Sequence, residues 1–391
     1  MKSKKSAIAL TAFLTFLVTT AMYIGAFVFF PSSGENLSGL RSSVVSGNGD
    51  FSEVRKYVKN DFINVPNEER LNSMAIKGYV AGLGDAYSSY YTKAEYSDLS
   101  EELTGNYKGI GIEVSITDDN RIIIIGVYKE APAYNAGIKV NDILTKVEGK
   151  AYTGEKLNDA ISVIRTAEGE ITITIERDGK EMDLKVTPTE VSIPCAESEM
   201  LEGDIGYIQL FSFSEDANEV FRTHVNKLVS DGAKALIIDL RDNPGGMLPT
   251  VVDIADLLLP EGNILTIQGR NMPKEEFKSG KTCIELPLYV LINGGSASAA
   301  EVLAGALKDH KRAVVIGETS YGKGVVQTVY ELDSGAALKL TTAKYYTPSG
   351  ECIDGKGITP DHEVKWEAQE GYVYSKETDI QLQKAIELIN K

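Results

Sequence analysis

Residues 288–308 read LYVLINGGSASAAEVLAGALK, and this stretch decides the fold. Leu288–Ile292 is a short, continuous apolar run, which is typical of a strand that is buried on both faces. Two glycines and several small residues follow, and apolar positions then recur with helical spacing from Ala299 to Lys308. The stretch therefore predicts a buried strand, a tight loop and an amphipathic helix.

The same kinds of element occur upstream. Asp216–Ser230 has helical spacing, Ala235–Asp239 is a second buried strand, and Pro249–Leu259 reads as a helix after a glycine-rich loop. Alternating helices and buried strands predict an α/β core, or α+β once the β-rich segment before it is included. In such sheets, ligands bind at the loops that follow the carboxyl ends of the strands. We therefore expect the functional residues in these loops.

Ser298 lies where the predicted loop becomes a helix. The unpaired amides and the dipole of a helix start favour developing negative charge, which suits a nucleophilic serine. Ser298 with Glu301 three residues later also fits a capping box, in which both residues only stabilise the helix start. The residues alone leave both interpretations open.

A second loop, Gly317–Gly324, reads GETSYGKG and resembles a phosphate-binding P-loop. However, Gly324 replaces the hydroxyl residue that would bind magnesium, and the β-like run Val325–Tyr330 follows where a P-loop opens a helix. On a strand, Lys323 and Gln327 point to the same face, so the Gln327 amide can orient the lysine amine. Lysine can act as a general base only when desolvation keeps it neutral, and the alternative is an ordinary surface lysine.

The sequence gives little support for a histidine general base or for a metal site. The chain has three histidines, His224, His310 and His362, and none belongs to an HExxH pattern. His310 is too close to Ser298 along one predicted helix to face it, and His224 has no evident partner. We therefore expect neither a histidine base nor a metal or other cofactor.

The composition of the chain excludes several classes of binding partner and of scaffold. The formal net charge of −16 argues against nucleic acid as a partner, because phosphate binding needs a concentrated basic surface. The three cysteines, Cys195, Cys283 and Cys352, form no CxxC pair, which excludes a zinc ribbon and a disulfide-rich scaffold. Their odd number favours buried thiols, with one disulfide still possible.

The amino terminus predicts a membrane anchor. Ser6–Phe30 lacks charged residues, and a helix of about 25 residues would span about 37 Å, more than the ~30 Å apolar core of a bilayer. Lysines at positions 2, 4 and 5 would stay in the cytoplasm and leave the rest of the chain outside. A cleaved signal peptide is the alternative, with a site near Thr19–Ala21.

The two loops that contain Ser298 and Lys323 resemble those of a known family. Ser298, Lys323 and Gln327, within SASAAE and YGKGVVQ, are similar to the motifs of the Ser-Lys carboxy-terminal processing peptidases (tail-specific proteases). The resemblance implies a crotonase/ClpP-like core in which Ser298 is the nucleophile, Lys323 the general base and Gln327 its orienter. Ser296 and Ser320 would then be structural.

The resemblance also implies an oxyanion hole. Its two amides would belong to Gly245, in the loop Asp239–Gly246, and to Ala299. This chain has Pro244 where many relatives have glycine, and proline cannot donate a hydrogen bond, so Gly245 and Gly246 both remain possible donors.

The β-rich segment resembles a PDZ domain over about residues 105–188. Gly109, Ile110, Gly111 and Ile112 are similar to the loop whose amides bind a peptide's terminal carboxylate while the peptide adds a strand. Ala131–Leu144 is similar to a second PDZ motif, with Asn141 in place of the usual glycine. Arg165 matches a position that we suspect of carrying a regulatory signal, although it could equally be a surface arginine.

The resemblance extends to the helical region after the linker (51–103) and to the C-terminal segment (369–391). In the family that the chain resembles, these segments commonly build a homodimer. The predicted division is an anchor (1–31), a linker (32–50), a helical region (51–103), a PDZ domain (104–190), a Ser-Lys peptidase core (191–368) and a C-terminal helical segment (369–391). We therefore expect a serine endopeptidase that recognises apolar C-terminal tails of proteins outside the cytoplasmic membrane. The alternatives are a catalytically silent binding protein and a PDZ scaffold.

Overall fold

A computed structural model describes residues 49–366 and 375–391. The chain divides into two compact units, Met1–Ala94 with Thr328–Thr341, and Glu95–Gln327 with Thr342–Lys391. The predicted anchor and most of the predicted linker lie outside the described residues. Among the helices that the structure describes, none has the length and apolar character needed to cross a membrane.

The larger unit contains a six-stranded sheet with the order β10-β11-β12-β15-β16-β19. Its strands are β10 (Ala196–Leu201), β11 (Ile205–Leu210), β12 (Ala235–Asp239), β15 (Leu288–Ile292), β16 (Ala313–Gly317) and β19 (His362–Glu363). β10 and β11 are antiparallel, and every later pair is parallel. The two strands predicted from apolar runs coincide with β12 and β15, so the expected α/β core is confirmed.

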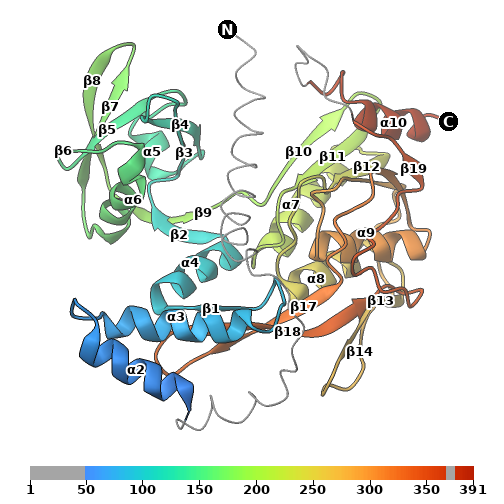
Figure 1. The fold of residues 1–391 in the computed structure, drawn as a ribbon. Helices are drawn as coiled ribbons and strands as arrows, with labels where there is room; N and C mark the ends of the chain where they lie inside the picture. The colour runs from blue at the N-terminus through green and yellow to red at the C-terminus, as the bar shows by residue number, and fades with distance from the viewer. Residues whose placement is uncertain (1–48, 367–374) are drawn as a thin grey trace. The chain divides into compact units, whose positions relative to one another are not determined.

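Alternate residues of these strands pack on opposite faces of the sheet, as the period of two requires. Leu236 and Ile238 belong to a core that also includes apolar residues of α7 (Ala217–Ser230), α8 (Leu248–Leu258) and α9 (Ala299–Asp309). Ile237 faces the other way and packs with residues of α10 (Ile380–Ile389). Both faces of the parallel sheet are therefore covered, and Figure 1 shows α10 close to the C-terminus of the chain.

A second sheet forms the β-rich module, with the order β3-β4-β5-β7-β8 and β6 paired to β5. These strands are β3 (Ile112–Ile116), β4 (Ile122–Val127), β5 (Ile143–Val147), β6 (Lys150–Ala151), β7 (Ile171–Arg177) and β8 (Lys180–Val186). The helices are α5 (Pro132–Asn135), a 3-10 turn η2 (Gly154–Lys156) and α6 (Leu157–Thr166). β2 (Asn106–Gly109) pairs with β9 (Thr189–Ser192) where the chain enters and leaves the module.

The helical region before the module is also present. It contains α2 (Asp50–Asp61), α3 (Glu68–Ala81), β1 (Ser89–Tyr91) and α4 (Lys93–Thr104). In the smaller unit, β1 pairs with β18 (Ala337–Tyr346) through residues 337–339. In the larger unit, β13 (Gly262–Gly269) pairs with β14 (Glu275–Ser279) and with the end of β18. β17 (Val325–Glu331) pairs with β18.

Candidate active site

The candidate site is built by three loops that follow β12, β15 and β16. These strands are parallel neighbours, so their carboxyl ends meet at one edge of the sheet. The loop after β12 is the glycine-rich turn, the loop after β15 holds Ser298, and the loop after β16 leads to Lys323. The three loops therefore lie at the same edge of the sheet.

Ser298 has an unusual backbone at the start of α9. Its φ is 55° and its ψ is −115°, a positive φ that L side chains rarely adopt. Such strain persists only where surrounding contacts determine it, and it is frequent at functional sites. Three backbone contacts are present here. The Ser298 amide donates to Glu301 Oε2 at 2.8 Å, and the Ser298 carbonyl accepts from the Tyr345 hydroxyl at 3.2 Å and from the Val302 amide at 3.0 Å.

The glycine-rich turn lies directly against this serine. Gly245 has a φ of 103°, and a Cβ added to it would lie 2.7 Å from Ser298 Cβ and 2.9 Å from the Ala299 nitrogen. Only glycine fits there. The structure thus brings the two predicted oxyanion residues together, although the Gly245 amide donates to Asn243 Oδ1 at 2.8 Å in this conformation. Asn243 is fully buried, and its Nδ2 donates to the Leu210 carbonyl.

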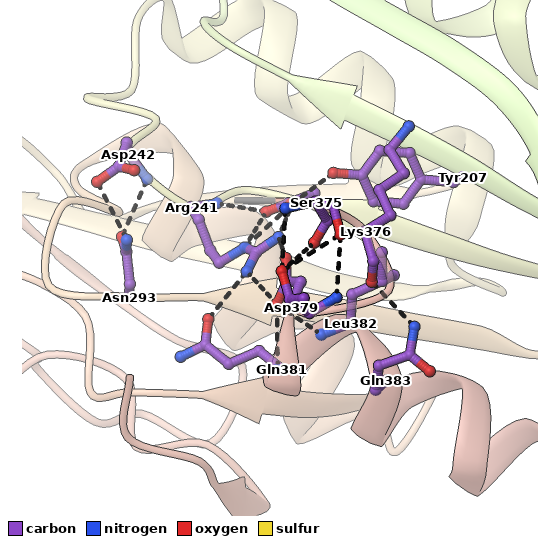
Figure 2. A network of polar contacts seen from close by, with 12 residues as sticks. Tyr207, Arg241, Asp242, Asn293, Ser375, Lys376, Asp379, Gln381, Leu382 and Gln383 are labelled. Carbon is purple, nitrogen blue, oxygen red and sulfur yellow. Dashed lines mark hydrogen bonds and ion pairs between the residues drawn. The ribbon is translucent and has the colours of Figure 1, made fainter. Parts of the chain in front are cut away.

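Side-chain contacts join the first two loops. The Asp242 amide donates to Asn293 Oδ1 at 2.9 Å, and Asn293 Nδ2 donates to Asp242 Oδ1 at 3.0 Å (Figure 2). Ser296 is buried, and its hydroxyl donates to the Leu240 carbonyl at 2.7 Å. This bond joins the nucleophile loop to the end of β12.

The third loop places Lys323 next to the nucleophile loop. The Lys323 amide donates to Glu301 Oε2 at 2.9 Å, the same oxygen that accepts the Ser298 amide. Lys323 is half-buried, and β17 starts two residues later and carries Gln327. A strand rather than a helix follows the lysine, so the P-loop alternative is excluded. A Cβ on Gly324 would lie 2.4 Å from the Asp354 nitrogen, so this position has no room for the hydroxyl residue of a P-loop.

Glu301 does more than the sequence suggested. Its side chain is fully buried, and Oε1 accepts from Ser320 Oγ at 2.6 Å and from the Gly322 amide at 2.6 Å. The capping interpretation accounted only for the bond to Ser298. The available signal was the position of Glu301 between the apolar residues Ala300 and Val302 in the first turn of α9, since charged residues are rarely fully buried without partners.

Comparison with known proteins identifies the family of the chain. The S41 peptidase family matches residues 204–364, and the PDZ domain family matches residues 108–187. A carboxy-terminal-processing protease of Bartonella bacilliformis is 38% identical over 332 residues, which cover 82% of this chain and 76% of that protein. The chain belongs to peptidase family S41. It is a serine-type peptidase with a PDZ domain.

Further relatives share this architecture. The carboxy-terminal processing protease CtpA of Bacillus subtilis is 35% identical over 351 residues, covering 88% of this peptidase and 75% of that protein. A solved structure described as an S41 protease of Bacteroides fragilis has a TM-score of 0.54, with 92% of this chain and 99% of that chain covered. It is only 15% identical, so it supports the fold alone.

His224 and His310 have bonding partners away from the candidate site. His310 Nε2 lies 2.7 Å from the Asn263 carbonyl oxygen. The expectation that His224 lacks a partner was wrong, because its Nδ1 lies 2.6 Å from Ser198 Oγ. Burial lowers the pKa of His224. In residues 49–366 and 375–391, no group of three or more histidine, cysteine, aspartate or glutamate side chains could hold a metal ion. The three cysteines are free thiols.

In the PDZ domain, the predicted carboxylate-binding loop joins β2 to β3. Ile110 is buried, and Gly111 has a φ of 78°. A Cβ on Gly111 would lie only 2.2 Å from Ala131 Cβ, so the loop packs closely on the second PDZ motif. The positive φ and this close approach explain why glycine is needed here.

Arg165 lies at the end of α6 and bonds to α4. Its guanidinium is 2.9 Å from Glu101 and 3.4 Å from Asp98, and it lies over the Tyr107 ring at 5.7 Å. The side chain is 36% exposed. Arg165 therefore connects α6 of the PDZ domain to α4, the helix that precedes the domain.

A buried ionic network supports the glycine-rich turn from the opposite face of the sheet. Arg241 is bonded to Asp239. It is also bonded to Asp379 and to Gln381 Oε1 at 3.1 Å (Figure 2). Both aspartates are 1% exposed. Burial alone would lower the pKa of Arg241, but the two carboxylates outweigh it and raise that pKa. Sequence reasoning missed this network because Arg241 and Asp379 are far apart in the chain.

Proposed function

We propose that this S41 peptidase is an endopeptidase that cleaves proteins through a Ser298-Lys323 acyl-enzyme mechanism. The observation that carries the proposal is that the amides of Ser298 and Lys323 donate to the same oxygen of Glu301. The glycine-rich turn also packs against Ser298, since a Cβ added to Gly245 would lie 2.7 Å from Ser298 Cβ.

In the proposed reaction, Ser298 Oγ attacks the scissile carbonyl carbon while the neutral amine of Lys323 takes the hydroxyl proton. Amides of Ala299 and of Gly245 or Gly246 stabilise the resulting oxyanion. The C–N bond then breaks, and the leaving nitrogen takes the proton from the Lys323 ammonium. Water attacks the ester, gives a proton to Lys323 and releases the carboxylate product, and the proton returns to Ser298.

This mechanism requires a lysine that is neutral when the substrate is bound. Partial burial of Lys323 supports this requirement, because desolvation disfavours the ammonium form. Gln327 would orient the amine from β17. A substrate chain that covers the loops would desolvate the amine further.

Labelling of Ser298 tests the assignment of the nucleophile. A fluorophosphonate probe is expected to form one adduct, which peptide mass spectrometry should map to the segment that contains Ser298. A catalytically silent scaffold would give no adduct there, and an adduct only on Ser296 or Ser320 would transfer the role to that residue.

The PDZ domain is proposed to bind the free, apolar C-terminus of the substrate. Gly111→Ala is expected to weaken binding of an apolar tail peptide at least about tenfold, because the new Cβ would collide with Ala131. Gly149→Ala is the matched control, since Gly149 also has a positive φ but nothing lies within 4 Å of its added Cβ. Fluorescence anisotropy with free and amidated peptides measures the effect, and equal binding by both variants would contradict the proposal.

Arg165 is proposed to couple tail binding to cleavage through its contacts with α4. In Arg165→Met, cleavage should depend less on whether the substrate tail is free or amidated. An unchanged ratio of the two rates would mean that Arg165 only packs on the helix.

We also propose a homodimer built by the helices of the smaller unit. Large apolar side chains on α2, α3 and the segment between them are 41% to 95% exposed. They are Phe51, Val54, Tyr57, Phe62, Ile63, Val65, Leu71, Met74, Ile76 and Tyr79. A second copy would remove this surface from water. Light scattering should show a mass that halves when Ile63 and Val65 are both changed to Asp, and an unchanged mass would reject this interface.

The proposed location is the outer side of the cytoplasmic membrane, with residues 1–31 as an uncleaved anchor. Membrane fractionation of the full chain and of a chain without these residues tests this. Recovery of both forms in the soluble fraction would reject the anchor.

A further inference from the structure

We propose that Glu301 is a positioning residue that holds the nucleophile loop and the lysine loop in register. This inference rests on the proposed Ser298-Lys323 mechanism. Glu301 is the fully buried acid of α9, and its four donors come from two separate loops. One donor belongs to residue 298, and the other three belong to residues 320, 322 and 323.

The distribution of bonds over the two carboxylate oxygens supports this role. Oε2 accepts one amide from each loop, at 2.8 Å from Ser298 and 2.9 Å from Lys323. Oε1 accepts the Ser320 hydroxyl and the Gly322 amide, both at 2.6 Å, which anchors the turn before the lysine. The single planar carboxylate therefore sets the separation of the two backbone segments that carry the nucleophile and its base.

A helix cap would not need this arrangement. In the capping box, the Glu301 side chain is needed only for its bond to the Ser298 amide, whereas its other three donors come from the lysine loop. A buried carboxylate is also expensive to keep ionised without several donors, and hydrogen bonds to charged groups are stronger than those between neutral groups. The acid is therefore suited to hold the amides of both loops at once.

The Ser320 hydroxyl extends the same connection. It donates to Glu301 Oε1 and accepts from the Ile358 amide at 2.6 Å. The segment that contains Ile358 thus holds the lysine loop from its other side. In the proposed mechanism, Glu301 contacts neither the substrate nor the reacting atoms. It therefore affects catalysis only through the positions of Ser298 and Lys323.

The test compares Glu301→Gln with Glu351→Gln. Glu351 carries the same charge, but its side chain is 60% exposed and pairs with Lys356. In Glu301→Gln, one oxygen becomes an amide nitrogen that faces donors. We expect kcat to fall about tenfold or more while KM changes less than about twofold, with fluorophosphonate labelling slowed to the same extent. Glu351→Gln should behave like the parent protein.

A second comparison separates positioning from general stability. In a Lys323→Ala background, Glu301→Gln should slow the residual labelling of Ser298 by a clearly smaller factor than in the parent, because the alignment of Ser298 with its base no longer contributes. A purely structural role predicts the same loss in both backgrounds, and that result would overturn the inference. Thermal melting and tail-peptide binding establish that each variant is folded.

If Glu301→Gln does not fold, Ser320→Ala provides the test. It removes one Oε1 donor, and kcat should fall about three- to tenfold at unchanged KM. A parental kcat in folded Glu301→Gln, or in Ser320→Ala when the first variant is unfolded, would refute the inference. If Ser298→Ala and Lys323→Ala retain activity, the proposed function itself fails, so the two failures are distinguishable.

Discussion

Replacing Ser298 or Lys323 by alanine is expected to lower the rate of substrate cleavage by about 10⁴-fold or more. Without Ser298 Oγ no acyl-enzyme can form, and without the Lys323 amine no group is positioned to take the hydroxyl proton. The two losses should not multiply in the double variant, because both residues act in one step. Cleavage of an unfolded protein substrate, followed by mass spectrometry, measures the rate.

Two exposed positions provide matched controls for these substitutions. Ser230→Ala, at the end of α7, and Lys185→Ala, in the PDZ domain, should cleave at the parental rate. Both active-site variants should keep the parental melting temperature and tail-peptide binding. Cleavage by either active-site variant at the control rate would show that the Ser-Lys assignment is wrong.

The second large effect concerns stability. Arg241→Met is expected to lower the free energy of unfolding by about 3 to 5 kcal/mol, because Asp239 and Asp379 would remain buried without their shared cation. The side chain of Arg241 is only 14% exposed, so water cannot take its place easily. Urea unfolding of the folded chain, monitored by circular dichroism, measures the change.

Lys234→Met is the control for the loss of an ion pair. Lys234 lies 2.6 Å from Asp204, but the two side chains are 77% and 55% exposed. Loss of an exposed pair should leave the free energy of unfolding almost unchanged, because water screens it. Equal destabilisation by the two variants would contradict the importance of burial at Arg241.

The same network predicts how stability depends on pH. Burial raises the pKa of Asp379, but hydrogen bonds and charge from Arg241 outweigh it and hold that pKa below its ordinary value of 3.8. A lowered pKa in the folded state means that the unfolded chain binds more protons at acid pH. The stabilisation by Asp379 is therefore present above about pH 3.8 and is lost as the pH falls below it. Arg241→Met should show a smaller loss in that range.

Arg241 also connects stability to the active site. It directly precedes the glycine-rich turn, and Asp379 caps the start of α10 through bonds to the Gln381 and Leu382 amides. The C-terminal helix therefore holds the base of the proposed oxyanion loop. The sequence indicated a C-terminal helix, but its packing on the sheet of the same chain could not be read from its periodicity.

Local patterns predicted most of the core correctly. The two central strands are almost entirely apolar: Ala235–Asp239 has one polar residue, Asp239, and Leu288–Ile292 has one tyrosine, Tyr289. Parallel strands that are covered on both faces have this composition because both faces pack on apolar side chains. The start of α9 and the strand after Lys323 were equally readable, since glycines and small residues mark the turns. The family resemblance then supplied roles that the residues alone left open.

By itself, the sequence determined which segments form strands and helices, because periodicity and glycine placement act over a few neighbouring residues. Only the tertiary structure decided that Glu301 serves two loops, that Arg241 meets Asp379, and that Gly245 lies against Ser298. Those contacts join residues from about 20 to 140 positions apart. The first and third exist because parallel strands bring their carboxyl ends to one edge, and the second exists because α10 packs on the sheet. No local pattern encodes which strands become neighbours, so the partners of a buried charge become visible only in the folded chain.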